Sequence, residues 1–398
     1  MLDPTSPVSS RLEMPNLRAL ARRGTNFLNT YAAAPQCVPS RTTMFAGRHT
    51  HKIQAWSNSQ ALAMRKEHVD AGCANAYSDG QCRAWGEQQA AAGFKGTFVD
   101  TLEDAGCLVC LYGKVDVGAG VIEAPGQENA TVPGFHGGPT LSITGRSADI
   151  RRPTKPDPIN ITNDSNNHVH EEDWLKTKEC MEWFDEKHSS SWMLYCSVNI
   201  PHPAFATNAT WLESVHEDLI NIPTWIPKDK FHPADSYMSQ SKDVWREFTD
   251  AEILAVRKTY YAMCVETDYL LGRVIDKANA TGHLENTFVI YVSDHGEMNM
   301  EHRQVWKNSM YEASARVPMI IAGPGVPAGR RVSNLTSLLD LYPTMVDIVG
   351  GEKPDWLDGH SLAPFLSSAS SPAGSNFAKH FAVRNGVGTY PFDRAVIA

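Results

Sequence analysis

Several polar side chains of this sequence follow directly after apolar segments, in positions where they could bind an anion or transfer a proton. They are Lys114 after segment 107–112, His202 after segment 192–198, and Asp294 and His295 after segment 288–292. In open α/β sheets, ligand-binding groups gather at the carboxyl ends of the strands. Each of these side chains alone would more often be a solvated loop residue, but together they predict one site.

Cys37 begins the run Cys-Val-Pro-Ser-Arg-Thr-Thr-Met-Phe-Ala-Gly-Arg, which ends at Arg48. Pro39 suits the first turn of a helix, where the missing proline N–H costs nothing. The residues after it would point backbone N–H groups at an anion held at the helix N-terminus. The alternative is a buried structural cysteine in front of a helix, which is a common environment for a single cysteine.

The elements that must position these residues alternate between strands and helices, which predicts an α/β fold with a largely parallel central sheet flanked by helices. Besides the helix after Cys37, helices are expected over 14–23, 98–105, 171–187, 249–277 and 338–349. Thr249 and Glu252 form a capping box at the start of the fourth. The short apolar segments 288–292 and 317–322 are typical of central strands covered on both faces.

The predicted organisation is one catalytic domain over residues 1–365, followed by an irregular tail over 366–398. Residues 61–96 are rich in Ala, Gln and Gly and are interpreted as an insertion. Residues 118–167 are rich in Gly, Pro, Asn and Thr, which predicts a long surface loop.

Composition limits the classes of function. A chain of 398 residues with 42% hydrophobic and 20% charged residues is typical of a globular protein with a large core. No run of 18 apolar residues is present, so no membrane span is expected. The net charge of −9 argues against a nucleic-acid surface. Basic groups that bind an anion must therefore be local.

The sequence also bears on the cellular compartment. N-glycosylation sequons occur at Asn129, Asn160, Asn163, Asn208, Asn279 and Asn334. Their number favours a secretory protein, although residues 1–4 show neither the basic nor the apolar region of a signal peptide. Among the eight cysteines, Cys196 and Cys264 lie in apolar segments where free buried thiols are common. Cys107-x-x-Cys110 could indicate redox or zinc chemistry, but its apolar setting favours a buried strand.

The chain resembles the type I sulfatases of the alkaline-phosphatase-like superfamily. The motifs that carry the resemblance are the Cys37 run, Gly113-Lys114-Val115-Asp116, Asn199-Ile200-Pro201-His202-Pro203, Ser293-Asp294-His295-Gly296-Glu297, Glu301-His302-Arg303-Gln304 and Asp340-Leu341-Tyr342-Pro343-Thr344. The similarity is strong over 15–56 and 192–350, and thin over 57–100 and 117–170. It implies that a maturation enzyme, the formylglycine-generating enzyme, oxidises Cys37 to formylglycine. One hydroxyl of the aldehyde hydrate would attack sulfur, and the other would later help to expel sulfate.

The resemblance also implies roles for the residues that match. Residue 37, Asp294 and His295 would bind one divalent metal ion, and oxygen-rich coordination of this kind suits calcium. Arg41 would hold the hydrate and offset its negative charge. The resemblance assigns sulfate binding to Lys114 and Lys307, and protonation of the leaving oxygen to His202.

The sequence departs from the family pattern in two respects. Many sulfatases carry a histidine two residues after the first active-site lysine, but this chain has Asp116, as does the arylsulfatase K subfamily that it resembles most. Asp116 is a candidate for the base that deprotonates the second hydroxyl. The family's N-terminal strand, with further metal ligands, and its C-terminal subdomain also find no counterpart. A truncated sequence is therefore expected, which would also account for the absent signal peptide.

The predicted function is hydrolysis of sulfate esters, with sulfated sugars or aryl sulfates as substrates, in a lysosomal or extracellular setting. One alternative is a phosphate or phosphonate ester hydrolase of the same superfamily, for which a Ser or Thr nucleophile would be expected. The other alternative is a non-catalytic protein that binds anions or glycans, because the metal site would lack its N-terminal ligands.

Overall fold

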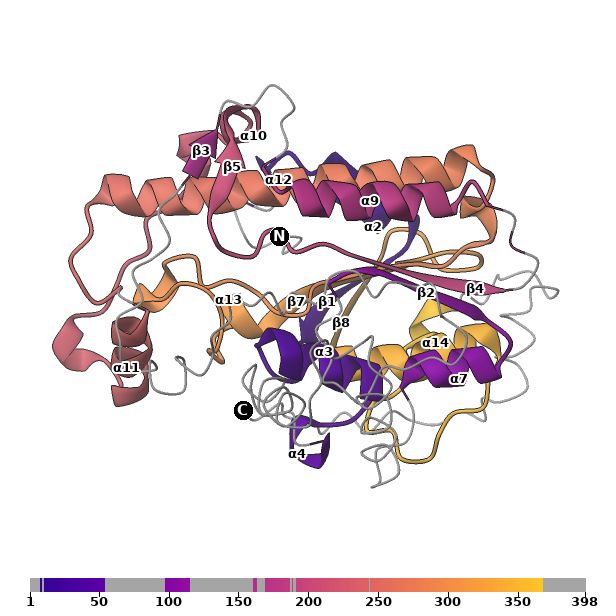
Figure 1. Cartoon of the computed structure of the whole chain (residues 1–398). Helices are drawn as coiled ribbons and strands as arrows, with labels where there is room; N and C mark the ends of the chain where they lie inside the picture. The colour runs from indigo at the N-terminus through magenta and orange to yellow at the C-terminus, as the bar shows by residue number, and fades with distance from the viewer. Residues whose placement is uncertain are drawn as a thin grey trace, which may run out of the picture.

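The central sheet has four strands and is mixed rather than largely parallel (Figure 1). In the computed structural model its strands are, in sheet order, β6 (Val289–Val292), β7 (Arg316–Ala322), β1 (Thr25–Tyr31) and β8 (Arg330–Ser337). β7 runs antiparallel to β6 and to β1, whereas β8 runs parallel to β1. The predicted α/β fold with a central sheet flanked by helices is confirmed, and the described four-stranded part of that sheet is mixed. Residues 293–315 return to β7 without the long crossover helix that usually joins parallel strands.

The structure describes residues 8, 11–53, 97–114, 160–162, 169–186, 188, 191–242 and 244–367. The predicted insertion 61–96 and nearly all of the predicted tail 366–398 lie outside these ranges. Within the predicted loop 118–167, only 160–162 is described, and it forms β3 (Asn160–Thr162), which pairs in parallel with β5 (Ala206–Asn208). The loop assignment is therefore wrong for that short segment.

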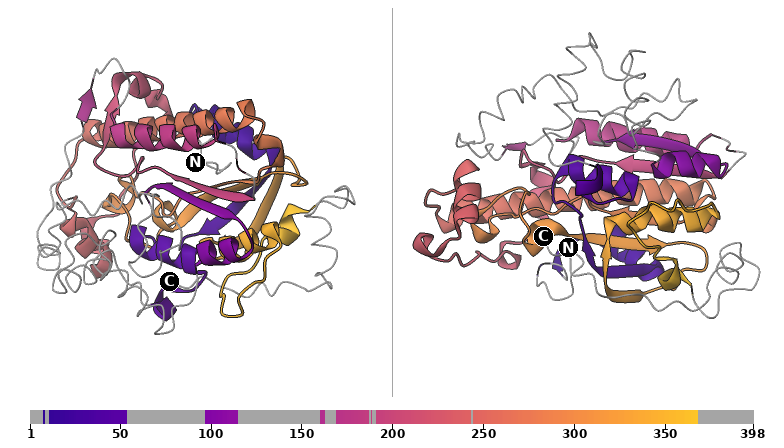
Figure 2. Two further views of the ribbon diagram at one scale, coloured as in Figure 1. Left: turned by 45° about the vertical axis from the view of Figure 1, so that its right-hand side comes forward. Right: turned by 90° about the horizontal axis from the view of Figure 1, so that it is seen from below.

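Helices cover both faces of the strands (Figures 1 and 2). One layer contains α2 (Pro15–Arg23), α9 (Glu171–Trp183) and α12 (Asp250–Ala280), and the other contains α3 (Cys37–Ala46), α7 (Phe98–Asp104) and α14 (Leu341–Val349). Successive residues of β7 serve the two layers in turn. Met319 and Ile321 pack into the core beneath α3, α7 and α14, while Ile320 packs against α2 and α12. This double burial explains why segment 317–322 is continuously apolar.

The predicted helices are confirmed, with small shifts at their ends. Thr249 and Glu252 form the expected capping box, in which the Thr249 hydroxyl accepts the Glu252 N–H and the Glu252 carboxylate accepts the Thr249 N–H. The segment predicted over 338–349 starts with the short 3-10 helix η5 (Leu338–Asp340) before α14. The remaining described helices are α4 (Thr50–Ile53), α10 (Ala209–Glu213), α11 (Pro233–Ser241), α13 (Glu312–Ala315), α15 (Ala363–Leu366), η1 (Glu217–Leu219), η2 (Lys228–Lys230), η3 (Leu284–Asn286) and η4 (Glu301–Arg303).

A second, two-stranded sheet lies beside the central one and consists of the parallel strands β2 (Leu108–Gly113) and β4 (Trp192–Ser197). β2 confirms the strand expected at Cys107-x-x-Cys110, and both of these thiols are free. Cys196 of β4 was expected to be a free thiol, but it forms a disulfide with Cys180. The packing of α9 against β4 brings the two Cα atoms to 6.2 Å from each other. Within the described ranges, no helix is long and apolar enough to cross a membrane.

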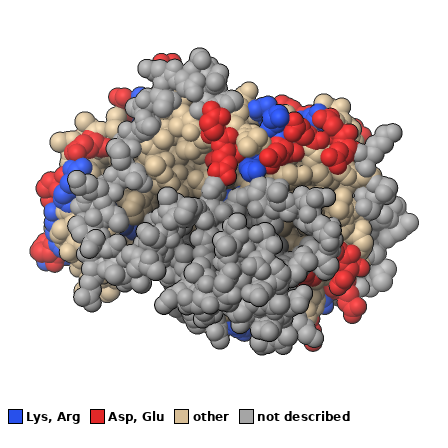
Figure 3. Space-filling view, in the orientation of Figure 1, with Lys and Arg blue, Asp and Glu red and all other residues tan. Residues whose placement is uncertain are grey.

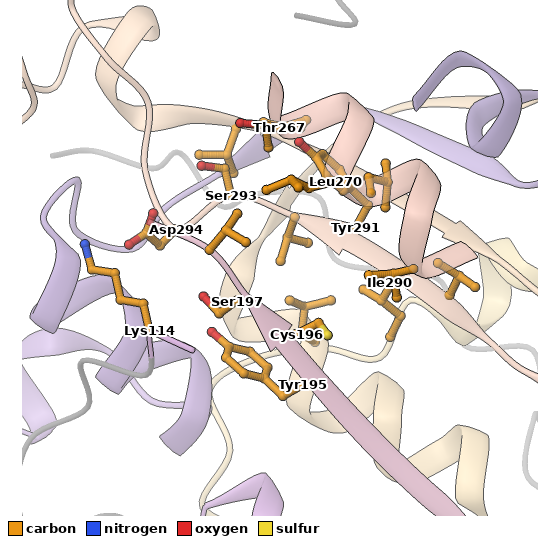
Figure 4. A pocket seen from close by; sticks show the side chains of 18 of the residues that line it. Lys114, Tyr195, Cys196, Ser197, Thr267, Leu270, Ile290, Tyr291, Ser293 and Asp294 are labelled. Carbon is orange, nitrogen blue, oxygen red and sulfur yellow. The ribbon is translucent and has the colours of Figure 1, made fainter. Parts of the chain in front are cut away.

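A cavity of about 1280 Å³ separates the two sheets. Residues of β4 and β6 line it from opposite sides, and side chains of α12 and α14 close its two faces. In the described part of the chain, β4 pairs with β2 alone and β6 pairs with β7 alone. Figure 4 shows the apolar side chains of this cavity and, at one end, Lys114 and Asp294.

Candidate active site

Cys37 is the first residue of α3 and is buried, with 3% of its surface exposed. It lies near Lys114 and Asp294, the polar residues at one end of the cavity. Pro39 lies in the first turn of α3, as predicted. The Cys37 Sγ is 3.2 Å from His295 Nε2 and 3.8 Å from Lys114 Nζ. Burial raises the pKa of the thiol, but the positive charges of Lys307 and Lys114 and contacts with His202 and His295 outweigh this effect and hold the pKa well below its usual value.

Asp294 and His295 follow β6 and reach the same point. Ligand atoms of Cys37, Asp294 and His295 all lie within 4.8 Å of one another. His295 Nδ1 donates to the carbonyl oxygen of Gly296 at 2.8 Å, which leaves the Nε2 lone pair facing the other two residues. Burial raises the pKa of Asp294, but the positive charges of Arg41 and Lys114 and the hydrogen bond from Arg41 lower it far more, so the carboxylate is ionised. These three residues therefore offer a divalent cation sulfur, oxygen and nitrogen donors.

Arg41 ties α3 to the ends of the strands. Its Nε donates to Asp294 Oδ2 at 2.7 Å, and its NH1 donates to the carbonyl oxygen of Lys114 at 2.7 Å. The same NH1 also binds the hydroxyls of Tyr195 and Ser197 on β4. The guanidinium thus fixes the positions of Asp294 and Lys114 relative to α3, in addition to supplying positive charge beside Cys37.

His202 and Lys307 contact each other beside Cys37. His202 Nδ1 donates to the carbonyl oxygen of Pro203, so its Nε2 accepts from the Lys307 ammonium. Burial and the positive charge of Lys307 lower the pKa of His202 to about 4. At neutral pH, His202 is therefore an uncharged imidazole held by an ammonium.

Lys114 completes the cationic set. It is 9% exposed, and its ammonium donates to Asn199 Oδ1 at 3.1 Å. Away from the site, the face in Figure 3 shows Lys and Arg interspersed with Asp and Glu over the described helices rather than gathered in a basic patch. The site's positive charge is accordingly local, as the overall charge of −9 led us to expect.

The comparison with protein families agrees with this geometry, because the sulfatase family model matches residues 8–351. The chain belongs to the sulfatase family. Arylsulfatase K of dog is 34% identical over 383 residues, and that of human is 35% identical over 383 residues. Each alignment covers 91% of this chain, which spans 63% of the length of these relatives.

Solved structures that resemble this chain show the same fold. The phosphonate monoester hydrolase of Agrobacterium radiobacter aligns with a TM-score of 0.62 and 22% identity, covering 92% of this chain and 74% of that protein. Another neighbour, solved in complex with its substrate D-glucosamine-2-N,6-O-disulfate, aligns with a TM-score of 0.59 and 18% identity, covering 93% of this chain and 80% of that protein. At these identities the likeness establishes the alkaline-phosphatase-like architecture alone.

The structure brings together all but one of the predicted site residues. They are Cys37, Arg41, Lys114, His202, Asp294, His295 and Lys307, whereas Asp116 lies outside the described residues. The sequence reasoning missed Asn199, the partner of the Lys114 ammonium, although it lies within the quoted Asn199-to-Pro203 motif. It also missed Asp173 on α9, whose carboxylate accepts the backbone N–H groups of Asn199 at 2.6 Å and Ile200 at 2.9 Å. A single acidic residue in a helix with other acidic residues gives no sequence signal for that role.

Proposed function

We propose that this protein hydrolyses sulfate esters with a formylglycine derived from Cys37. The observation that supports this most is the convergence of cationic and hydrogen-bonding side chains on residue 37 at the start of α3. Lys114, Lys307 and His202 surround it from separate loops. A sulfate group with charge spread over its oxygens would be stabilised by this arrangement, and most strongly as charge develops in the transition state.

The roles of the individual side chains follow from their positions. A hydroxyl of the hydrated residue 37 attacks sulfur, and the bond between sulfur and the leaving oxygen breaks. Lys114 and Lys307 bind the sulfate oxygens, and His202, once protonated, delivers its proton to the leaving oxygen. When the second hydroxyl loses its proton, the carbon–oxygen bond to sulfate breaks and the aldehyde is regenerated. Asp116 remains our candidate for the base in that last step.

A divalent metal ion fits the donors present. Asp294 and His295 would hold it together with residue 37, and the ion would lower the pKa of the attacking hydroxyl. Converting the Cys37 sulfur into an aldehyde hydrate changes the donor set to two oxygens and one nitrogen, which favours a hard cation such as calcium. Calcium takes about six to eight ligands, so atoms beyond these three residues would complete its shell.

The proposal also covers the substrate, the maturation partner and the compartment. The relatives named arylsulfatase K and a neighbour solved with a disulfated glucosamine favour sulfated sugars, with aryl sulfates as model substrates. Formation of formylglycine requires the formylglycine-generating enzyme, which places maturation in the secretory pathway and the mature protein in a lysosome or outside the cell. Exposed Asn279 suits glycosylation, whereas Asn208 is 2% exposed and its side chain accepts the N–H of Thr210, so that sequon is masked in the folded protein.

The decisive experiment combines two measurements on protein co-expressed with the formylglycine-generating enzyme. Peptide mass spectrometry identifies residue 37 as aldehyde or thiol, and hydrolysis of an aryl sulfate and of sulfated uronate and glucosamine units is measured with added calcium. We expect the aldehyde together with sulfate release that is lost in Cys37→Ala. Folded protein with an aldehyde at residue 37 but no sulfate release would refute the proposal and leave an anion-binding protein as the better account.

The second candidate is phosphonate ester hydrolysis, because phosphonate monoester hydrolases are among the structural neighbours. Both ester classes place a tetrahedral anion against the same cations. Parallel assays with an aryl sulfate and an aryl phosphonate monoester distinguish the two. A higher kcat/KM for the phosphonate would favour this second candidate.

A further inference from the structure

The segment that carries Lys307 has an unusual backbone. Positive φ angles occur at Asn299, Met300, His302, Arg303, Trp306 and Asn308, and these are the non-glycine residues with positive φ in the described part of the chain. Such conformations are sparsely populated by residues with a Cβ, and they persist where surrounding groups hold them. The position of the Lys307 ammonium therefore depends on whatever holds residues 297–308.

Four side chains from outside this segment bind its carbonyl oxygens. Arg257 donates to the oxygen of Asn299, Trp225 to that of Met300, Ser239 to that of Arg303, and Lys242 to that of Lys307. The last of these contacts differs from the others. Lys242 binds the main chain of the same residue whose side chain reaches His202 at the site.

Lys242 is a buried cation with a fixed partner. It follows α11, is 3% exposed, and its Nζ lies 2.6 Å from the Lys307 carbonyl oxygen. Burial lowers its pKa to about 8, while the nearby Glu297 carboxylate opposes the shift. Glu297 itself accepts the N–H groups of Asn299 and Trp306, so it fixes the two sides of the segment near both lysines. Keeping a lysine in such a place costs desolvation energy, which a purely structural contact to one carbonyl would not require.

We propose that Lys242 is a positioning residue that sets the location of the Lys307 ammonium beside residue 37. Its charged hydrogen bond pins the Lys307 main chain at the end of a segment with few conformational alternatives. Within the described ranges, Lys242 hydrogen-bonds the Lys307 carbonyl oxygen and neither His202 nor Cys37, so it acts on the site through Lys307. That the Lys307 ammonium binds sulfate rests on the proposed function. That Lys242 positions this ammonium does not.

The test uses full-length protein from a host without the formylglycine-generating enzyme, so that residue 37 remains a thiol. Cys37 is alkylated with anionic iodoacetate and with neutral iodoacetamide, and the two rates are measured by peptide mass spectrometry. Their ratio reports positive charge next to the thiolate and is independent of how much thiolate is present. Lys307→Met defines the ratio without the ammonium. Ser239→Ala is the matched control, because it removes another carbonyl anchor of the same segment.

We expect Lys242→Met to lower the ratio several-fold, close to the value of Lys307→Met, while Ser239→Ala stays near wild type. We expect the same fall in the ratio for Lys242→Gln, whose amide is too short to reach the same carbonyl. This variant replaces Lys242→Met in the test if the methionine variant does not fold. A wild-type ratio in either folded variant, or an equal fall in Ser239→Ala, would overturn the proposal.

Affinity for inorganic sulfate, measured by calorimetry on the converted protein, is the second readout, and we expect it to weaken several-fold in Lys242→Met. A sulfate affinity equal to that of the wild type would also overturn the proposal. Absence of sulfate-ester turnover in the wild type refutes the proposed function and leaves the alkylation result for Lys242 standing.

Discussion

Arg41 and Asp294 form a buried ion pair in which Nε lies 2.7 Å from Oδ2, and this pair joins the N-terminal half of α3 to the end of β6. Because NH1 of the same guanidinium binds the Lys114 carbonyl oxygen, α3 is also fixed to the end of β2. The start of α3, with residue 37, is thereby held at the ends of β6 and β2, which come from distant parts of the sequence.

Replacing Arg41 should therefore affect stability as well as activity. Arg41→Lys keeps a charge but cannot bind Asp294, Lys114 and Tyr195 together. Because a lysine ammonium leaves some of these buried acceptors without a donor, we expect the free energy of unfolding to fall by about 2 kcal/mol. Denaturant titration measures the change. The exposed pair Lys178–Glu182 supplies the control, since Lys178→Ala should change little. Similar losses in both variants would contradict the structural role of Arg41.

The loop that carries His202 should depend on Asp173. Its carboxylate is 5% exposed and accepts the N–H groups of Asn199 and Ile200. Asp173→Ala leaves both buried donors without this acceptor, which should lower the free energy of unfolding by roughly 2 kcal/mol and reduce kcat through misplaced His202 and Asn199. Steady-state kinetics below the melting temperature separate the two effects. Glu172→Gln, at the exposed neighbouring position, should retain wild-type kcat and stability.

Metal binding should be measurable without turnover. Calcium that binds the folded state alone raises the melting temperature in a concentration-dependent way. We expect this rise in the wild-type protein and its loss in His295→Gln, which removes a donor from the Cys37, Asp294 and His295 cluster. The exposed His216→Gln lies outside the cluster and should behave like the wild type. An undiminished rise in His295→Gln would place the ion elsewhere.

Stability should fall as pH rises from about 4.5 to about 7 because of Glu266. This side chain is fully buried, its Oε1 accepts from Trp174 Nε1 at 2.7 Å, and burial raises its pKa from 4.5 to about 7. The folded state thus binds a proton that the unfolded state has released in this pH range, and stability drops by about 3 kcal/mol across it and stays lower above it. Glu266→Gln keeps the acceptor for Trp174, so it should be more stable than wild type at pH 8 and lose this contribution to the slope. Urea titrations at several pH values test this; parallel curves for the two proteins would show that Glu266 remains ionised.

The sequence predicted which polar residues lie together better than it predicted the strands of the central sheet. Apolar runs such as 317–322 are buried on both faces, and the polar residues after runs such as 288–292 lie at strand ends, so both features are visible in the sequence. β1 and β8 were missed because their strands contain many Asn, Thr and Ser residues. Thr30 and Thr336, for example, face each other across these strands with their hydroxyl oxygens 2.8 Å apart. Hydroxyls that bind each other inside a sheet look like loop residues when only the sequence is read.

The supporting contacts of the site could not be predicted for a different reason. Asp173, Asn199 and Lys242 act through backbone or side-chain atoms of residues that lie close by only in the folded chain. A lysine near the end of a polar helix is usually solvated, and nothing in its neighbourhood along the sequence distinguishes Lys242. Only the packing of α11 against residues 297–308 gives that lysine its partner.

The cavity between β4 and β6 also leaves one edge of each of these strands open within the described ranges. Apolar residues such as Leu194 and Ile290 are only half-buried there, and each strand has one edge that meets no other described strand. An open strand edge is a template on which another extended chain can add by backbone hydrogen bonds. Within the described ranges, the facing edges of β4 and β6 are therefore the places where a further strand could pair with either sheet.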